Sequence, residues 1–385
     1  MELSRIMFAL IRTALFDTNL DEEIKNKITP EILPKLYKMS KLHDLTHLVA
    51  LGLEKAGLFE IDPYATERYS EIRGMSVFRF ERISYELENI YSLFDANAVE
   101  YIPLKGSVIR KYYPEPWMRT SCDIDILVRE DSIDNAVTLL CEKLGYKNDG
   151  RKYHDVCLIS PSGVHLELHF SILENQANID GLLAKAWEYV TPENEGGRYA
   201  LKTEFLVFHV LAHASYHFLS GGCGIRPILD YYILKRKVSF DELELEKFLR
   251  ECGLFKFYES IIALANAWFA GAVLPEKYKE VEKYILCGGV YGTLENKVTV
   301  QQARKGSKFK YVWDRIFMPY EQLKVAYPVL EKRKWLTPVY QIKRWFRVIF
   351  GGKFKKSVLE FNTSASVTEE RALRTEQMMK ELELL

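Results

Sequence analysis

The chain has 385 residues, enough for more than one packed unit with a sizeable apolar core. Hydrophobic residues make up 48% of it and charged residues 28%, a composition that excludes a disordered chain. The 53 basic and 53 acidic residues balance each other, which argues against a protein whose main task is to coat nucleic acid.

The cysteines and the apolar runs indicate in which cellular compartment the protein is expected. The six cysteines are scattered singly, without the paired spacing of a zinc site or the density of a disulfide scaffold. No apolar run approaches the roughly 20 residues needed to span a bilayer, and Arg5 and Arg12 bracket a helical pattern at the N-terminus that differs from a signal peptide. We therefore expect reduced thiols and a cytoplasmic protein without a transmembrane segment.

In chain order, the apolar period changes twice. Residues 1–97 are predicted to be helical, because apolar positions recur every three or four residues. Residues 98–175 alternate short strands with helices, the strands being YIPL, DIDILV, HDVCLIS and VHLELHF. Residues 176–385 are predicted to be helical again, most clearly in TEFLVFHVLAHASYHFL. These changes predict an N-terminal helical region, a small αβ core and a C-terminal helical domain with those boundaries.

Two aspartates alternate with isoleucines in the predicted strand DIDILV. Side chains two apart in a strand point to the same face, so Asp123 and Asp125 should project together, roughly 6 to 7 Å apart, while Ile124 and Ile126 enter the core. Two like charges this close raise each other's pKa unless a cation neutralises them. Mg²⁺ commonly takes one or two carboxylates and shares the rest of its shell with substrate phosphates.

A third acid, Glu167, stands between leucines in VHLELHF, with His165 and His169 on the same face. If HDVCLIS and VHLELHF form a hairpin next to DIDILV, three carboxylates converge on one face of the sheet. Two-metal phosphoryl transfer uses such a geometry, in which one ion activates the attacking oxygen and the other clamps the leaving group.

The stretch Lys105-Gly106-Ser107 follows the first predicted strand and fits the same site. A glycine there lets backbone N–H groups approach a phosphate, and the following helix N-terminus favours anions. Ser107 can donate a hydrogen bond, and Lys105 or Arg119 can neutralise triphosphate charge. The alternative is an edge strand with a merely solvated acidic face and surface salt bridges. The order of the motifs favours the site over that alternative.

These residues resemble the pattern of the polymerase β-like nucleotidyltransferase superfamily, and within it an uncharacterised bacterial nucleotidyltransferase family. The matching positions are Leu104-Lys105-Gly106, Tyr113-Pro114, Arg119, the stretch from Asp123 to Val128, and Glu167-Leu168-His169. The resemblance implies an α+β fold, in which a nucleotidyltransferase palm with a small mixed sheet is flanked by N- and C-terminal helical regions.

The resemblance also implies a chemistry. A nucleoside monophosphate would pass from an NTP such as ATP to a hydroxyl or other nucleophile of an unidentified acceptor, a small molecule or a protein side chain. Asp123 and Asp125 would ligate two Mg²⁺ or Mn²⁺ ions, and Glu167 would be the third carboxylate. Lys105, Gly106, Ser107 and Arg119 would bind the nucleotide. A nucleic-acid acceptor is the less favoured alternative.

Histidines recur every fourth residue in the long C-terminal helix pattern. His209, His213 and His217 fall on one helical face. A zinc site needs further ligands and a supporting shell, so zinc stays the minority alternative. We expect a half-buried row that pairs with Asp230 or lines the acceptor side of the cleft.

Further candidates for the acceptor side come from the helix pattern IRPILDYY and from the strand VHLELHF. Arg226 and Asp230, one turn apart, are expected to bracket two helices, and the alternative is that they orient a nucleobase or the acceptor. With His169, His213 and His217 they complete the candidate cleft residues.

The run KRKWLTPVYQIKRWFRVIFGGKFKK, residues 332–356, has nine Lys or Arg and no acid. With Trp335, Trp345 and Phe346 it could bind RNA by charge and stacking, or lie on an anionic membrane. The favoured interpretation is a basic helix face that balances acidic helices elsewhere and buries its aromatic rings in the core.

Three functions therefore compete. The first is a metal-dependent nucleotidyltransferase. The second is a catalytically silent relative that binds nucleotide or a partner protein, such as the antitoxin half of a toxin–antitoxin pair. The third is an RNA- or membrane-surface-binding module that uses residues 332–356. The presence of Asp123, Asp125 and Glu167 together with the Lys-Gly-Ser stretch favours the first.

Overall fold

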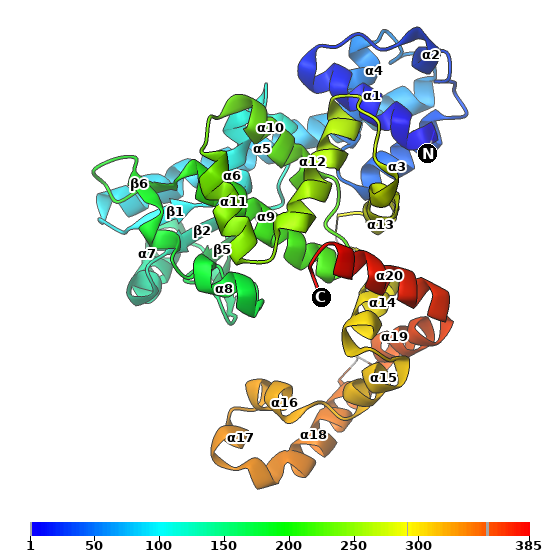
Figure 1. Cartoon of the computed structure of the whole chain (residues 1–385). Coiled ribbons are helices and arrows are strands. Elements are labelled where there is room, and N and C mark those ends of the chain that lie inside the picture. Colours follow the sequence, from blue (N-terminus) through cyan, green and yellow to red (C-terminus); the bar gives the residue numbers. More distant parts are fainter. Residues whose placement is uncertain (1, 291, 352–353) are drawn as a thin grey trace. The chain divides into compact units, whose positions relative to one another are not determined.

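The computed structural model describes residues 2–290, 292–351 and 354–385 (Figure 1). The chain divides into two compact units. The first runs up to Tyr216 and continues over Ile225–Lys279, and the second contains His217–Gly224 and Glu280–Leu385. The three regions expected from the sequence rest on secondary structure rather than on contacts, and they stay a prediction. Over the described residues, no helix combines the length and the apolar character needed to cross a bilayer.

The first unit is α+β, as the sequence predicts. Its N-terminal part is helical: α1 (Glu2–Phe16), α2 (Glu22–Lys25), α3 (Leu33–Leu42), α4 (Thr46–Lys55) and the long α5 (Pro63–Ala96). The central part contains β1 (Tyr101–Pro103), α6 (Gly106–Ile109), β2 (Asp123–Val128), α7 (Ile133–Leu144), β3 (Lys147–Arg151), β4 (Asp155–Ile159) and β5 (His165–His169).

The central sheet has the strand order β1-β2-β5-β4-β3. β2 and β5 are parallel, whereas the other neighbouring pairs are antiparallel, so the sheet is mixed. The hairpin of β4 and β5 lies next to β2, which is the arrangement that the strand motifs predict. DIDILV and HLELH therefore occupy adjacent strands in the middle of the sheet.

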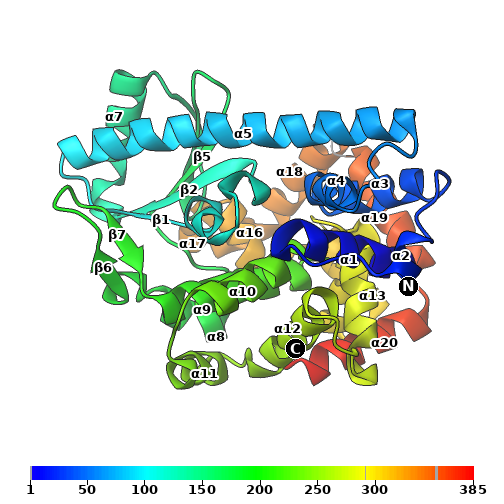
Figure 2. The same ribbon diagram turned by 90° about the horizontal axis from the view of Figure 1, so that it is seen from above.

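One face of this sheet is covered by α5 and α7, and Figure 2 shows α5 running along it. Ile124 and Ile126 of β2 are fully buried there, together with apolar residues of β4 and β5. Ile90 and Phe94 of α5 complete this core. Because side chains alternate along a strand, the intervening residues of β2 and β5 are left for the opposite face.

The remaining elements are mostly helical. The first unit continues with α8 (Ala177–Leu183), β6 (Val190–Pro192), β7 (Tyr199–Leu201), α9 (Thr203–Leu219, whose end belongs to the second unit), α10 (Arg226–Lys237), α11 (Glu242–Glu251) and α12 (Phe255–Phe269). The second unit contains α13 (Lys279–Gly288, from its second residue), α14 (Leu294–Lys305), α15 (Lys308–Ile316), α16 (Tyr320–Ala326), α17 (Val329–Lys332), α18 (Thr337–Phe350), α19 (Phe354–Ser366) and α20 (Glu369–Glu381).

Single-turn 3₁₀ helices connect several of these elements: Arg110–Tyr112, Pro116–Met118, Glu130–Ser132, Ala186–Glu188, Glu276–Tyr278 and Lys334–Leu336. The expected strand set lacked β3, whose residues are all exposed. Such a strand has no apolar face, and therefore no alternation that a sequence pattern could reveal.

The interpretation that residues 332–356 bury their aromatic rings is wrong for two of the three. Trp335 is 75% exposed and Phe346 is 56% exposed. Trp345 is half-buried, and its indole Nε1 donates to the Ile316 carbonyl over 2.8 Å. Periodicity predicts an apolar stripe on a helix but does not say what covers it.

Candidate active site

β2 and β5 bring three acids to one face of the sheet. Their parallel register pairs Asp125 with Glu167, and Asp123 with His165. Residues in register on neighbouring strands point to the same face, so Asp123, Asp125 and Glu167 all project away from the α5 and α7 core. The sequence motifs predicted this convergence.

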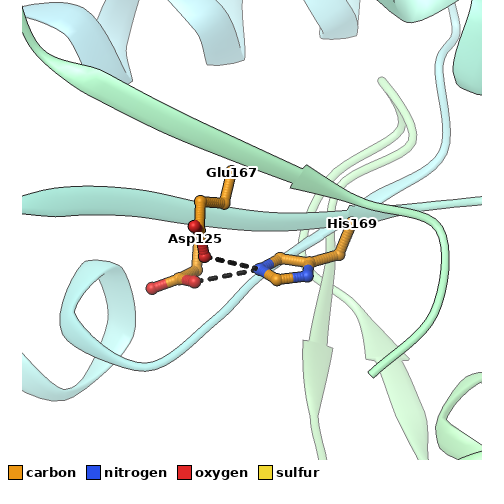
Figure 3. A group of neighbouring side chains, drawn as sticks. All are labelled: Asp125, Glu167 and His169. Atoms are coloured by element: carbon orange, nitrogen blue, oxygen red, sulfur yellow. Dashed lines mark hydrogen bonds and ion pairs between the residues drawn. The ribbon is translucent and has the colours of Figure 1, made fainter. Parts of the chain in front are cut away.

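Asp125 is the most tightly held of the three carboxylates. It is almost fully buried, and its Oδ1 accepts hydrogen bonds from Lys105 Nζ over 2.9 Å and from His169 Nε2 over 3.0 Å. His169 Nε2 also lies 3.8 Å from Glu167 Oε2, and Figure 3 shows the ring directed at both carboxylates. His169 therefore fixes the spacing between the acids of two strands.

Lys105 reaches Asp125 because of the backbone turn after β1. Lys105 has φ 44° and ψ −117°, in the half of conformational space that non-glycine residues rarely adopt. The backbone N–H of Leu104 donates to the Asp125 carbonyl over 3.0 Å, which ties this turn to β2. Strain of this kind is kept where the surrounding structure enforces it, often at a functional site.

The two aspartates have opposite electrostatic surroundings. Burial raises the pKa of Asp123, and the neighbouring charge of Asp125 raises it further. Burial also disfavours the charged form of Asp125, but Lys105 and His169 outweigh it and hold the pKa of that carboxyl well below its usual range. Asp123 is thus the carboxylate that would gain most from an added positive charge.

Glu167 belongs to a second cluster on the β4 side. Lys152 Nζ donates to Glu167 Oε1 over 2.9 Å and to Asp155 Oδ2 over 3.1 Å. Asp155 is fully buried, and its Oδ1 has no hydrogen-bond partner within the described part of the chain. The sequence motifs did not single out Lys152 or Asp155, because nothing local marks a lone acid at the start of a strand.

The donor set suits a divalent cation. Asp125, Glu167 and His169 each present a ligand atom within 4.8 Å of the others, and Asp155, Cys157 and Glu167 form a second such group. Hard cations prefer carboxylate oxygens, and the ammonium groups of Lys105 and Lys152 already lie against these oxygens as positive charges. The residues present therefore fit a cation site.

The Gly106-Ser107 turn differs in one respect from its prediction. A Cβ on Gly106 would lie 2.7 Å from Arg119 Nη1 and 3.0 Å from Ser121 Cβ, so the glycine is required for packing under Arg119. The residue of this turn with a positive φ is Lys105 instead. Ser107 Oγ is buried and has no hydrogen-bond partner among the described residues, so a donor or acceptor there is left for a ligand.

Comparison with known proteins identifies the family. A family described as uncharacterised nucleotidyltransferase matches residues 31–270, which is more than half of the chain and includes the whole central sheet. The chain belongs to this family. No curated protein and no solved structure matches it.

Membership makes the protein an enzyme of the nucleotidyltransferase class, which implies an NTP substrate. Nucleotidyltransferases generally use divalent metal ions, and the acidic cluster on β2 and β5 could bind one. The resemblance deduced from the Lys-Gly and Asp-Ile-Asp motifs is thereby confirmed.

Arg119 of this nucleotidyltransferase is engaged within the protein. Its Nη2 lies 2.8 Å from Asp230 Oδ2 and its Nε lies 3.3 Å from Asp230 Oδ1, so the pair is bidentate. The two side chains are only 9% and 3% exposed. Tyr113 donates to the same carboxylate over 2.7 Å. Arg119 and Asp230 thus connect the loop before β2 to α10, and nucleotide binding by Arg119 stays a prediction.

Arg226 links α10 to the turn between α3 and α4. Its Nη2 lies 2.5 Å from Asp44 Oδ2, and Thr120 donates to the same oxygen over 2.8 Å. Asp44 has φ 54° and lies between α3 and α4. The expected bracket between helices is present, but its acidic partner Asp44 is 182 residues away in the sequence, where no pattern points to it.

The three histidines of the predicted row have different surroundings. His209 is buried, and burial together with the charge of Lys105 lowers its pKa to about 3. His213 Nδ1 lies 2.6 Å from Glu174 Oε1, so the expected pairing of this row with Asp230 is wrong. His217 is half-buried near the end of α9. Glu174 was missed, since it lies in a loop without a motif.

Proposed function

We propose that this nucleotidyltransferase moves a nucleoside monophosphate from an NTP, such as ATP, to an acceptor, with Asp123, Asp125 and Glu167 holding two divalent cations, Mg²⁺ or Mn²⁺. The observation that carries the proposal is the shared face: Asp125 and Glu167 are in register on parallel strands, and Asp123 lies two residues before Asp125. The six cysteines are free thiols, which supports a cytoplasmic site for the reaction.

The protein's own groups prepare this face for cations. Lys105 and His169 keep the Asp125 carboxylate ionised, so it is available as a ligand without a change of protonation. Asp123 has a raised pKa because of burial and the neighbouring charge of Asp125, which Lys105 and Arg119 offset only in part. Bound cations would supply the positive charge that activates an attacking oxygen and stabilises the transferred phosphate.

The nucleotide side is proposed to lie at Lys105, Gly106 and Ser107. The unpartnered Ser107 Oγ supports a phosphate contact there, and Lys105 Nζ lies 2.9 Å from Asp125 Oδ1. Arg119 would act mainly by positioning this turn, because a side chain on Gly106 would collide with its guanidinium.

The acceptor side is proposed to contain the pair of His213 and Glu174. Burial lowers the pKa of Lys105, but the charges of Asp125 and, to a smaller extent, Glu174 raise it, which supports a position of the pair near the acidic cluster. A histidine oriented by a carboxylate can take a proton from an acceptor hydroxyl. Arg226 and Asp230 would shape this side, and the acceptor is a small molecule or a protein side chain.

A panel of labelled NTPs with Mg²⁺ or Mn²⁺ tests the proposal by following which label moves, and onto which molecule. Asp123→Asn should lower transfer at least about a hundredfold, because several kcal/mol of transition-state stabilisation is lost. Its unfolding free energy should stay the same or rise, since the substitution removes a buried charge pressed against Asp125.

The matched control is Asp149→Asn, the same change at an exposed position of β3 in the same sheet. The control should transfer label like the wild type. Full activity in Asp123→Asn would overturn the assignment of the carboxylates, and NTP binding without any transfer would favour the catalytically silent alternative.

A further inference from the structure

The helix α18 exposes an apolar arc to its surroundings. Its members recur at spacings of three, four, three and one residue, which places them on one side of a helix. They are Val339, Ile342, Phe346, Ile349 and Phe350, and every one is exposed. Phe350 is 77% exposed, at the end of the helix.

The opposite side of α18 attaches the helix to its own unit through polar groups. Arg344 donates to the carbonyls of Arg315 and Ile316 at the end of α15, over 2.6 and 3.1 Å. Gln341 Nε2 donates to the Met318 carbonyl over 2.5 Å. A surface helix usually turns its apolar stripe inward and its polar face outward, and α18 does the reverse.

The apolar surface continues from α18 onto α15. Ring contacts connect Phe309 to Trp313, Trp313 to Phe317, and Phe317 to Trp345, with centroids 6.0, 4.6 and 5.5 Å apart. Phe309, Trp313 and Phe317 are all exposed as well. Exposed large apolar side chains gathered on neighbouring helices are typical of an interaction site.

The charged residues of the sequence run that contains α18 are all positive. Residues 332–356 contain nine Lys or Arg and no acid. Lys343 and Arg347 are exposed neighbours of the apolar arc, and both lie over the ring of Tyr327. The partner must therefore be negatively charged and must also accept aliphatic side chains.

We propose that α18 lies flat on an anionic lipid bilayer, with the apolar arc in the interfacial region and the basic side chains at the lipid phosphates. RNA would satisfy the charge but offers nothing to Val339, Ile342 and Ile349, which cannot stack on bases. A second copy, joined through the same surface, would bring two basic runs together and repel. Trp335, exposed just before the helix, suits the membrane–water boundary.

Vesicle co-sedimentation of the full chain tests this surface. The probes are vesicles of phosphatidylcholine alone and vesicles in which about a third of the lipid is phosphatidylglycerol. Anionic vesicles should bind the protein at least about tenfold more tightly, since each Lys or Arg near the surface is attracted to the lipid phosphates. The double variant Phe346→Glu/Ile349→Glu should lose at least about tenfold of that binding.

The matched control is Leu243→Glu/Val273→Glu, which makes the same change in charge at two exposed apolar positions of the first unit. It should bind anionic vesicles like the wild type. Equal binding of both double variants would overturn the proposal, and so would a wild type that ignores vesicles. If the wild type forms a dimer that Phe346→Glu/Ile349→Glu dissociates and the control variant does not, the proposal is overturned. Tighter binding to RNA than to vesicles would also overturn it.

Fluorescence gives a second readout that does not depend on a charged substitution. With anionic vesicles, emission of the full chain should shift to shorter wavelength, and Trp335→Phe should remove part of that shift. An unchanged spectrum on vesicle addition would contradict insertion at this surface.

Discussion

The two units depart in opposite ways from the usual rule that charges lie outside and apolar side chains inside. The first unit buries charges and pairs them, as in Arg119 with Asp230 and Lys105 with Asp125. The second unit exposes large apolar side chains such as Trp335 and Phe346. Buried charge is costly unless it is paired, and the first unit pairs it within its own fold. Exposed apolar surface is costly unless it is covered, and the second unit leaves these side chains exposed.

The largest effect on stability is expected from the buried ion pair of the first unit. Asp230→Ala should lower the unfolding free energy by about 3–5 kcal/mol, because it leaves the Arg119 guanidinium buried without its partner. Urea unfolding measures this change. Asp149→Ala, at an exposed position, should stay within about 0.5 kcal/mol of the wild type. A loss below about 1 kcal/mol for Asp230→Ala would mean that water reaches the pair.

The sequence predicts well that three acids share one face of the sheet, and it predicts the contacts around them poorly. Asp123, Asp125 and Glu167 follow from the period of two in a strand and from one hairpin, which are local patterns. The partners Asp44 and Glu174 lie far from Arg226 and His213 in the chain, in segments without periodicity. Such contacts depend on how helices pack, which the sequence pattern alone does not fix.

A smaller effect is expected from His47, a buried histidine of the first unit. Its Nε2 donates to the Met118 carbonyl over 2.8 Å, and burial lowers its pKa to about 4. Below about pH 6.5 the unfolded chain binds a proton at this ring that the folded protein does not, so stability should fall as the pH falls.

The size of that effect follows from the same pKa. Between pH 7 and pH 5 the wild type should lose about 2 kcal/mol more unfolding free energy than His47→Gln, which keeps a side-chain N–H but does not titrate. Urea unfolding at both pH values measures the difference. Equal losses in the two proteins would show that the His47 ring stays accessible to protons.

The smallest effect on the unfolding free energy is expected from the exposed aromatic side chains of the second unit. Phe346→Ala should change the unfolding free energy by no more than about 0.5 kcal/mol, because the ring is already exposed. Phe94→Ala, the same change in the core of the first unit, should cost about 3–5 kcal/mol. A large loss for Phe346→Ala would show that this side chain is covered in solution and would remove the contrast between the units.

The basic run also shows what a pattern leaves open. The interpretation of residues 332–356 as a basic helix face correctly predicts a helix there, and α18 occupies Thr337–Phe350 with an apolar stripe along it. Whether that stripe faces a core depends on the neighbouring elements, and the polar contacts of Arg344 and Gln341 turn it outward. The favoured interpretation failed at this step.

The acidic face itself is tested most directly by Mn²⁺ binding to the full chain, followed by the electron paramagnetic resonance signal of the free ion. Asp123→Asn should bind Mn²⁺ at least about tenfold more weakly than the wild type, while Asp149→Asn binds it equally well. If the wild type and Asp123→Asn have the same affinity, or if neither protein binds the ion, the three strand carboxylates do not form a cation site.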